Sequence, residues 1–194
     1  MEHYYQTLFD YVAQILTLPE SDKASIRQTF RPVFVPKDTL LENAGTVPQY
    51  HNFIVSGHMR NFHLDADGNE VTIDLNDGPR FFTSYFHFIN RTVTNEALHC
   101  ITDCEVLRIS RDDADMTAEY SLTQKDYTIG ILQRHLQEDK LRITDMTTLT
   151  AEERYRKLLR EKPTIIRHVP LGYVASYLGI TQRHLSRLRR EVTA

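Results

Sequence analysis

Residues 174–187, VASYLGITQRHLSR, predict two helices joined by a tight turn. Apolar residues recur at helical spacing before the glycine, at Leu171, Val174, Ala175 and Leu178. Gly179 permits the positive-φ conformation of a tight corner, and Thr181 is a good N-cap for the helix that follows. A helix, a short glycine turn and a second helix are typical of a helix-turn-helix.

The second of these helices has a basic face and an apolar face. With about 100° of rotation per residue, Leu185 and Leu188 fall on one side and a polar set on the other. Arginine pairs with guanine edges in the major groove and glutamine with adenine, so the polar set suits base reading in duplex DNA. The residues that we expect to contact DNA are Thr181, Gln182, Arg183, Ser186, Arg187 and Arg190. The alternative is a helical module that binds a protein partner.

Charge is distributed unevenly along the chain. Residues 149–194 contain ten Lys and Arg against four Asp and Glu, whereas residues 1–148 contain 13 against 22, which gives net charges of +6 and −9. A basic module on an acidic body indicates a polyanionic partner at one end of the molecule, because neutralised phosphates release counterions. Thr150 and Glu153 form a capping-box pattern that starts a new helix, and Pro163 marks its end. We therefore assign residues 149–194 to a helix-turn-helix domain.

The first half of the chain has the pattern of an antiparallel β structure behind two helices. Residues 1–30 show helical spacing, and residues 33–109 contain short β-branched and aromatic runs broken by Gly and Pro. The Asp67-Gly68 turn between the runs 59–64 and 71–75 predicts a hairpin. The expected fold class is α+β, with an N-terminal antiparallel β-roll or jelly-roll over residues 1–110.

A long helix is expected between the two domains, over residues 111–148. One apolar stripe repeats every three or four residues and contains the candidate dimerisation residues Ile129, Leu132, Leu136 and Ile143. A second stripe, on the opposite side, consists of Tyr120, Tyr127, Ile131 and Leu141. A helix that packs on its own sheet and on a symmetry mate needs two apolar faces, so the pattern favours a homodimer. A helix sandwiched within one chain is the alternative.

Taken together, the sequence resembles the Crp/Fnr superfamily of bacterial regulators over nearly its whole length. The most specific match is residues 174–181 followed by Leu185-Ser186-Arg187, which are similar to the family's helix-turn-helix with its Ser-Arg pair. Residues 53–57 and 103–110 are similar to the family's cyclic-nucleotide-binding β-roll. The resemblance implies a transcription regulator that binds a palindromic DNA site as a homodimer, and it allows RNA polymerase as a partner. Arg183 stands where many members carry Glu, so the preferred site is expected to differ.

The resemblance also locates an effector pocket, but it argues against cAMP. An ungapped alignment places Thr83-Ser84 at the family's ribose-binding Gly-Glu pair and Thr94 at its phosphate-binding Arg. Neither Ser84 nor Thr94 supplies the charge that a cyclic nucleotide needs. A gap in this alignment would instead make Arg91 a candidate for the phosphate-binding position, with Glu96 nearby. The candidate pocket residues are Thr83, Ser84, Tyr85, Arg91, Thr94 and Asn95, the effector is unassigned, and a cluster of aromatic residues from Phe81 to Phe88 indicates a plugged or repurposed pocket.

Other functions find little support in the sequence. No phosphate-binding glycine loop, nucleophile elbow or HExxH pattern occurs, so we do not expect an enzyme. Cys100 and Cys104 are too few to hold zinc or an iron-sulfur cluster and are expected to be buried, reduced thiols. The chain has no run of about 18 apolar residues, and its start lacks the pattern of a secretory signal. We therefore expect a cytoplasmic protein without membrane contact. A β-roll that senses a small molecule and acts through a protein partner is the alternative function.

Overall fold

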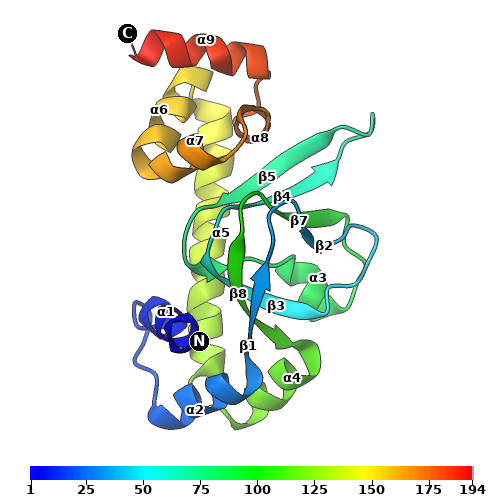
Figure 1. Cartoon of the computed structure of the whole chain (residues 1–194), viewed down its shortest axis with the longest axis vertical. Helices are drawn as coiled ribbons and strands as arrows, with labels where there is room; N and C mark the ends of the chain where they lie inside the picture. Colours follow the sequence, from blue (N-terminus) through cyan, green and yellow to red (C-terminus); the bar gives the residue numbers. More distant parts are fainter. Residues whose placement is uncertain (194) are drawn as a thin grey trace.

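A computed structural model describes the backbone of residues 1–193 and the side chains of residues 1–191. Figure 1 shows a β-roll, a long helix along its side and a cluster of helices at the C-terminal end. The strands are β1 (Arg31–Val35), β2 (Leu40–Glu42), β3 (Tyr50–Ser56), β4 (Met59–Leu64), β5 (Glu70–Asn76), β6 (Arg80–Phe81), β7 (Glu96–Cys100) and β8 (Cys104–Ser110). The helices are α1 (Glu2–Val12), α2 (Glu20–Thr29), α3 (Tyr85–Asn90), α4 (Arg111–Tyr120), α5 (Gln124–Thr148), α6 (Ala151–Glu161), α7 (Pro163–His168), α8 (Leu171–Tyr177) and α9 (Gln182–Thr193).

The roll consists of two antiparallel four-stranded sheets, with the orders β1-β8-β3-β6 and β2-β7-β4-β5. Alternate residues of β3 point to opposite faces of its sheet, and both faces are buried. Ile54 packs between the sheets with Met59 and Val106, whereas Phe53 and Val55 join the outer core, to which α1 and α5 contribute. The uninterrupted apolar run of β3 is thus explained by burial on both sides.

The predicted hairpin is confirmed as β4 and β5, which pair in antiparallel fashion. The Asp65 carboxylate accepts hydrogen bonds from the backbone N–H groups of Asp67 (3.0 Å) and Asn69 (2.8 Å). Gly68 has a φ of 81°, a conformation in which a side chain would be strained. Cys100 and Cys104 are free and buried, as expected.

The helical region after the roll is divided into two helices, and this corrects part of the sequence-based prediction. Asp22 of α2 accepts hydrogen bonds from Ser121 Oγ (2.9 Å) and from the backbone N–H of Thr123 (2.9 Å), and so fixes the break between α4 and α5. Tyr120 lies on the separate helix α4 and is 81% exposed, so its place in a buried second stripe is wrong. Leu141 is 50% exposed and also does not belong to the core, whereas Tyr127 and Ile131 are buried as predicted.

The C-terminal helices form their own core and rest on the β4–β5 hairpin. Leu75 of β5 and Ile101, which follows β7, belong to the same buried cluster as the residues between α6, α7, α8 and α9. The backbone N–H of Thr72 donates to Ser176 Oγ of α8 at 2.9 Å. Arg60 of β4 is 2% exposed, and its guanidinium lies 3.5 Å from the centre of the Tyr173 ring. Among the described residues, no helix combines the length and hydropathy required to cross a membrane.

Candidate nucleic-acid interface and effector cavity

The helix-turn-helix is built as its local sequence predicts. Thr150 Oγ1 accepts from the Glu153 N–H (3.3 Å), and the Glu153 carboxylate accepts from the Thr150 N–H (2.8 Å), which completes the capping box of α6. Gly179 has a φ of 69° in the turn after α8. Thr181 Oγ1 accepts from the His184 N–H at 3.2 Å and caps the start of α9. These local hydrogen bonds fix where α6 and α9 begin.

Helix α7 was not expected from the sequence. Pro163 was interpreted only as the end of the preceding helix, yet it is also the first residue of α7. Proline is favoured at that position because its φ suits a helix and its missing N–H is not needed there. Pro163 therefore both ends α6 and starts α7. Helix α7 has only six residues, which is too short for a helical repeat to be recognised in the sequence.

Helix α9 presents its polar face to solvent. Leu185 and Leu188 are 0% and 5% exposed and anchor the helix on the domain core. Of the six predicted DNA contacts, Ser186 is half-buried and the others are exposed, namely Thr181, Gln182, Arg183, Arg187 and Arg190. The Arg187 side chain is 63% exposed, and its nearest carboxylate, Glu191, is 3.9 Å away. The face is therefore available to an external ligand, and α9 lies at the end of the molecule farthest from α2 (Figure 1).

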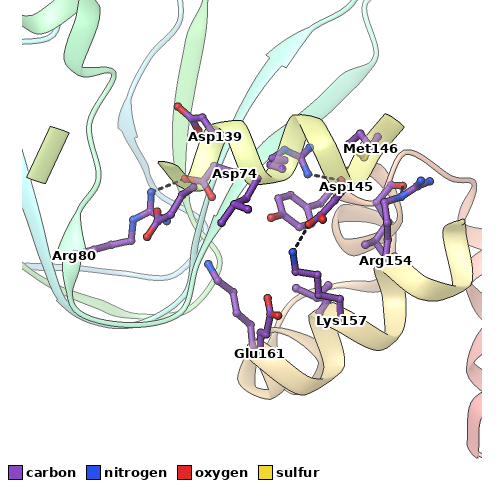
Figure 2. A pocket seen from close by; sticks show the side chains of 15 residues that line it. Asp74, Arg80, Asp139, Asp145, Met146, Arg154, Lys157 and Glu161 are labelled. Atoms are coloured by element: carbon purple, nitrogen blue, oxygen red, sulfur yellow. Dashed lines mark hydrogen bonds and ion pairs between the residues drawn. The ribbon is translucent and has the colours of Figure 1, made fainter. Parts of the chain in front are cut away.

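Ionic and polar contacts hold this domain against α5. These contacts surround a cavity of about 290 Å³, which is lined by residues of α5, α6, the end of α8 and the edge of the roll. Figure 2 shows that Lys157 of α6 points to Asp145 of α5, at 2.5 Å, on one side of this cavity. Arg142 of α5 donates to the backbone carbonyl of Tyr177 (3.0 Å) and lies over its ring. The start of α9 is thus connected through α8 to the long helix.

A larger cavity, of about 830 Å³, lies between the roll and α5. We name it the roll–helix cavity. Three of the predicted effector residues line it, namely Thr83, Ser84 and Tyr85. Thr94 is buried behind Ser84, and their hydroxyl oxygens are 3.0 Å apart. The structure does not bring the other two candidate residues to this cavity: Arg91 points to Asp115, at 2.7 Å, and Asn95 is exposed outside the lining.

The aromatic cluster does not plug this cavity. Phe81 and Phe82 are buried at its edge, whereas Tyr85 and Phe86 are more exposed along its wall. Phe88 is buried and points elsewhere, toward His51 and Tyr85. Of the two alternatives drawn from the sequence, a plugged or a repurposed pocket, this arrangement favours the second.

The start of α3 carries carboxylates instead of cations. Ser84 Oγ donates to Glu96 Oε2 at 2.8 Å, and the Ser84 N–H donates to Glu42 Oε2 at 3.3 Å. Glu42 is 7% exposed, and burial raises its pKa to about 7. Glu42 and Glu96 were not candidate pocket residues, because only the folded roll brings β2 and β7 to the start of α3. An anionic group is disfavoured beside these carboxylates.

We expect the buried Glu42 to make stability depend on pH. Its pKa rises from 4.5 to about 7 on folding. The protonated Glu42 therefore contributes fully to the free energy of unfolding below the unfolded pKa, and this contribution is lost as pH rises through 7. Glu42→Gln should therefore gain stability relative to wild type between about pH 5 and about pH 8, by on the order of 1–3 kcal/mol. Asn52 Oδ1 is buried and has no hydrogen-bond partner among the described residues, and it can accept from the new amide if the Asn52 side chain flips. Urea unfolding of both proteins at both pH values measures their free energies of unfolding. The same pH dependence in wild type and in Glu42→Gln would contradict the prediction.

The predicted dimerisation residues form an exposed apolar stripe on α5. Ile129, Leu136 and Ile143 are 53%, 70% and 66% exposed, and Leu132 is partly covered. The opposite face of the helix is buried through Tyr127 and Ile131. Leu132, Leu136 and Ile143 also border the roll–helix cavity. The exposed apolar stripe of α5 therefore also forms part of the cavity wall.

Comparisons with known proteins agree on the fold. No protein-family model and no curated protein sequence matches the chain. Among solved structures it is similar to FixK2 from Bradyrhizobium japonicum, with a TM-score of 0.72, 17% identity and 84% coverage of each chain. It is also similar to the c-di-GMP-responsive global regulator CLP from Xanthomonas campestris, with a TM-score of 0.71, 17% identity and coverage of 90% of this chain and 92% of that one.

A third similar structure comes from Eubacterium rectale and is assigned to the Crp/Fnr family. Its TM-score is 0.70 at 16% identity, with coverage of 91% of this chain and 84% of that one. Identities this low establish a shared architecture and leave the residues of each site to be argued from this chain. The resemblance inferred from the sequence is confirmed at the level of the fold. The chain has the β-roll and helix-turn-helix fold of the Crp/Fnr-type regulators.

Proposed function

We propose that this protein is a transcription regulator that binds a palindromic DNA site as a homodimer and reads bases with α9. The observation that carries the proposal is the exposed polar face of α9, which includes Arg183 and Arg187, on a helix anchored by Leu185 and Leu188. An exposed helix with arginines and a glutamine on one face suits the major groove. The net charge of +6 over residues 149–194 supports attraction to phosphates.

The homodimer is supported by the apolar stripe of α5. A palindromic site requires two recognition helices about 34 Å apart, one turn of DNA. A second copy that packs along Ile129, Leu136 and Ile143 would cover apolar surface that one chain leaves in water. The roll–helix cavity is the proposed effector site, and cAMP is not the proposed effector. The proposal divides the chain into a β-roll domain over residues 1–110, a dimerisation region over residues 111–148 and a DNA-binding domain over residues 149–194.

The salt dependence of binding to mixed-sequence duplex DNA tests the proposal against a protein-partner function. Fluorescence anisotropy of a labelled duplex is measured at about 50 mM and about 200 mM salt. Contacts to 6–10 phosphates lower the affinity by roughly 10³- to 10⁵-fold over this range. We expect a fall of roughly that size. Undetectable binding, or binding that changes little with salt, would favour the sensor that acts through a protein partner.

A further inference from the structure

The roll–helix cavity has the size and walls of a small-molecule site. Its volume of about 830 Å³ lies within the roughly 300–1,000 Å³ that is typical of ligand pockets. Phe82, Tyr85 and Phe86 contribute aromatic rings from the segment around the start of α3, and Leu98, Leu132 and Leu136 contribute aliphatic groups from β7 and α5. These walls favour a ligand with an apolar body.

The end of the cavity at Ser84 offers a carboxylate oxygen that is not buried and has no protein donor among the described residues. Glu96 Oε2 accepts from both Ser84 Oγ (2.8 Å) and Asn61 Nδ2 (2.7 Å). Within the described part of the chain, Glu96 Oε1 accepts no hydrogen bond, and Glu96 lines the cavity. Glu42 lies directly behind, where it accepts from the Ser84 N–H. This end therefore attracts a positive group that can donate hydrogen bonds.

The other end of the cavity does not reverse this preference. Its two guanidinium groups are already engaged: Arg80 pairs with Asp74 at 2.8 Å, as Figure 2 shows, and Arg142 donates to the Tyr177 carbonyl. Asp139 adds a further carboxylate to the lining. Burial lowers the pKa of His135 to about 4, so this side chain is neutral at neutral pH. The cavity therefore carries more carboxylates than cationic side chains.

We infer that the roll–helix cavity binds a cationic amphiphile, with a primary ammonium at Glu96 and Ser84 and an apolar body against the aromatic wall. The ammonium has three donors for Glu96 Oε1 and the neighbouring hydroxyls. Tyr85 and Phe86 also line this cavity and offer aromatic rings to the apolar body of the ligand. The inference deepens the proposed function, because it assigns a chemical class to the effector of the proposed regulator.

Three probes with one indole skeleton separate charge from shape. Tryptamine carries an ammonium, tryptophol a hydroxyl and indole-3-acetate a carboxylate, and cAMP serves as an anionic cyclic nucleotide. Isothermal titration of the full chain at neutral pH should show tryptamine binding about 10-fold or more tighter than tryptophol, in line with a charge-assisted hydrogen bond. Indole-3-acetate and cAMP should bind more weakly than tryptophol. A different order of affinities, or no binding of tryptamine at millimolar concentration, would overturn the inference.

A matched pair of variants places the ammonium. Glu96→Gln keeps the size of the side chain and removes its charge, so it should abolish the advantage of tryptamine over tryptophol, because it weakens tryptamine binding far more than tryptophol binding. Asp139→Asn makes the same change at the other end of the cavity and should keep most of that advantage. The reverse result would refute the placement at Glu96. The affinities of the wild-type chain test the ligand class even if a variant fails to fold.

The same preparations distinguish this inference from the proposed function. If tryptamine binds most tightly among the probes and duplex DNA is not bound, the ligand inference stands and the regulator proposal fails. If DNA is bound with the expected salt dependence and the anionic probes bind most tightly, the regulator proposal stands and the ligand inference fails.

Discussion

Arg187→Ala is expected to lower the affinity for the preferred DNA site by about 100-fold or more, without a measurable change in stability. A bidentate contact between arginine and guanine contributes roughly 1–3 kcal/mol of base discrimination, and a homodimer makes this contact twice. The Arg187 side chain is 63% exposed, so its removal should change the free energy of unfolding by less than about 0.5 kcal/mol. Anisotropy titrations with the specific duplex, together with thermal melting, measure both quantities.

Arg27→Ala is the matched control for this prediction. Arg27 is an exposed arginine of α2 that pairs with Glu2 at 2.7 Å, and α2 lies at the opposite end of the molecule from α9 (Figure 1). The control removes the same charge and should keep the affinity within about twofold, as expected for a charge more than a Debye length away. Equal losses in the two variants would mean that net charge, and not base contact, carries the binding.

Leu136→Asp is expected to convert a dimer into a folded monomer and to reduce DNA affinity by about 100-fold or more. Leu136 is 70% exposed in the single chain, so the fold should tolerate the change, whereas a carboxylate buried between two α5 helices is costly. A monomer binds only one half-site and loses the effective concentration that links the two, a factor of about 10²–10⁴. Sedimentation equilibrium at micromolar concentration and DNA titration measure the two effects.

Gln137→Asp is the corresponding control. Gln137 is the next residue of α5 and is exposed, and about 100° of rotation takes it away from the apolar stripe. The same new charge at this position should leave both the dimer and the DNA affinity unchanged. A wild-type chain that is monomeric at micromolar concentration would contradict the dimer regardless of the variants.

The sequence was most informative where structure depends on neighbouring residues. The hairpin at Asp67-Gly68, the capping box at Thr150 and the turn at Gly179 are each determined within about five residues by side-chain capping or by glycine conformation. Helical spacing likewise identified the buried and exposed faces of α9. These patterns predicted the helix-turn-helix and the β-roll.

The sequence was less informative where distant segments meet. The break between α4 and α5 is capped by Asp22, about a hundred residues earlier in the chain. Glu42 and Glu96 come together at Ser84 only because β2 and β7 are neighbours in one sheet. Arg91 was a candidate ligand because a gapped alignment would place it at the family's phosphate-binding position, and its pairing with Asp115 could not be seen from the sequence. Pocket composition therefore needed the tertiary structure, whereas the exposed polar face of α9 did not.

Selection of binding sites from random duplex DNA, with the wild-type chain and with Arg187→Ala, determines whether α9 reads DNA bases. We expect the wild-type chain to enrich a palindrome with half-sites one helical turn apart, and we expect Arg187→Ala to lose this enrichment. Selection that enriches no sequence with the wild-type chain, or the same palindrome with both proteins, would contradict base reading by α9.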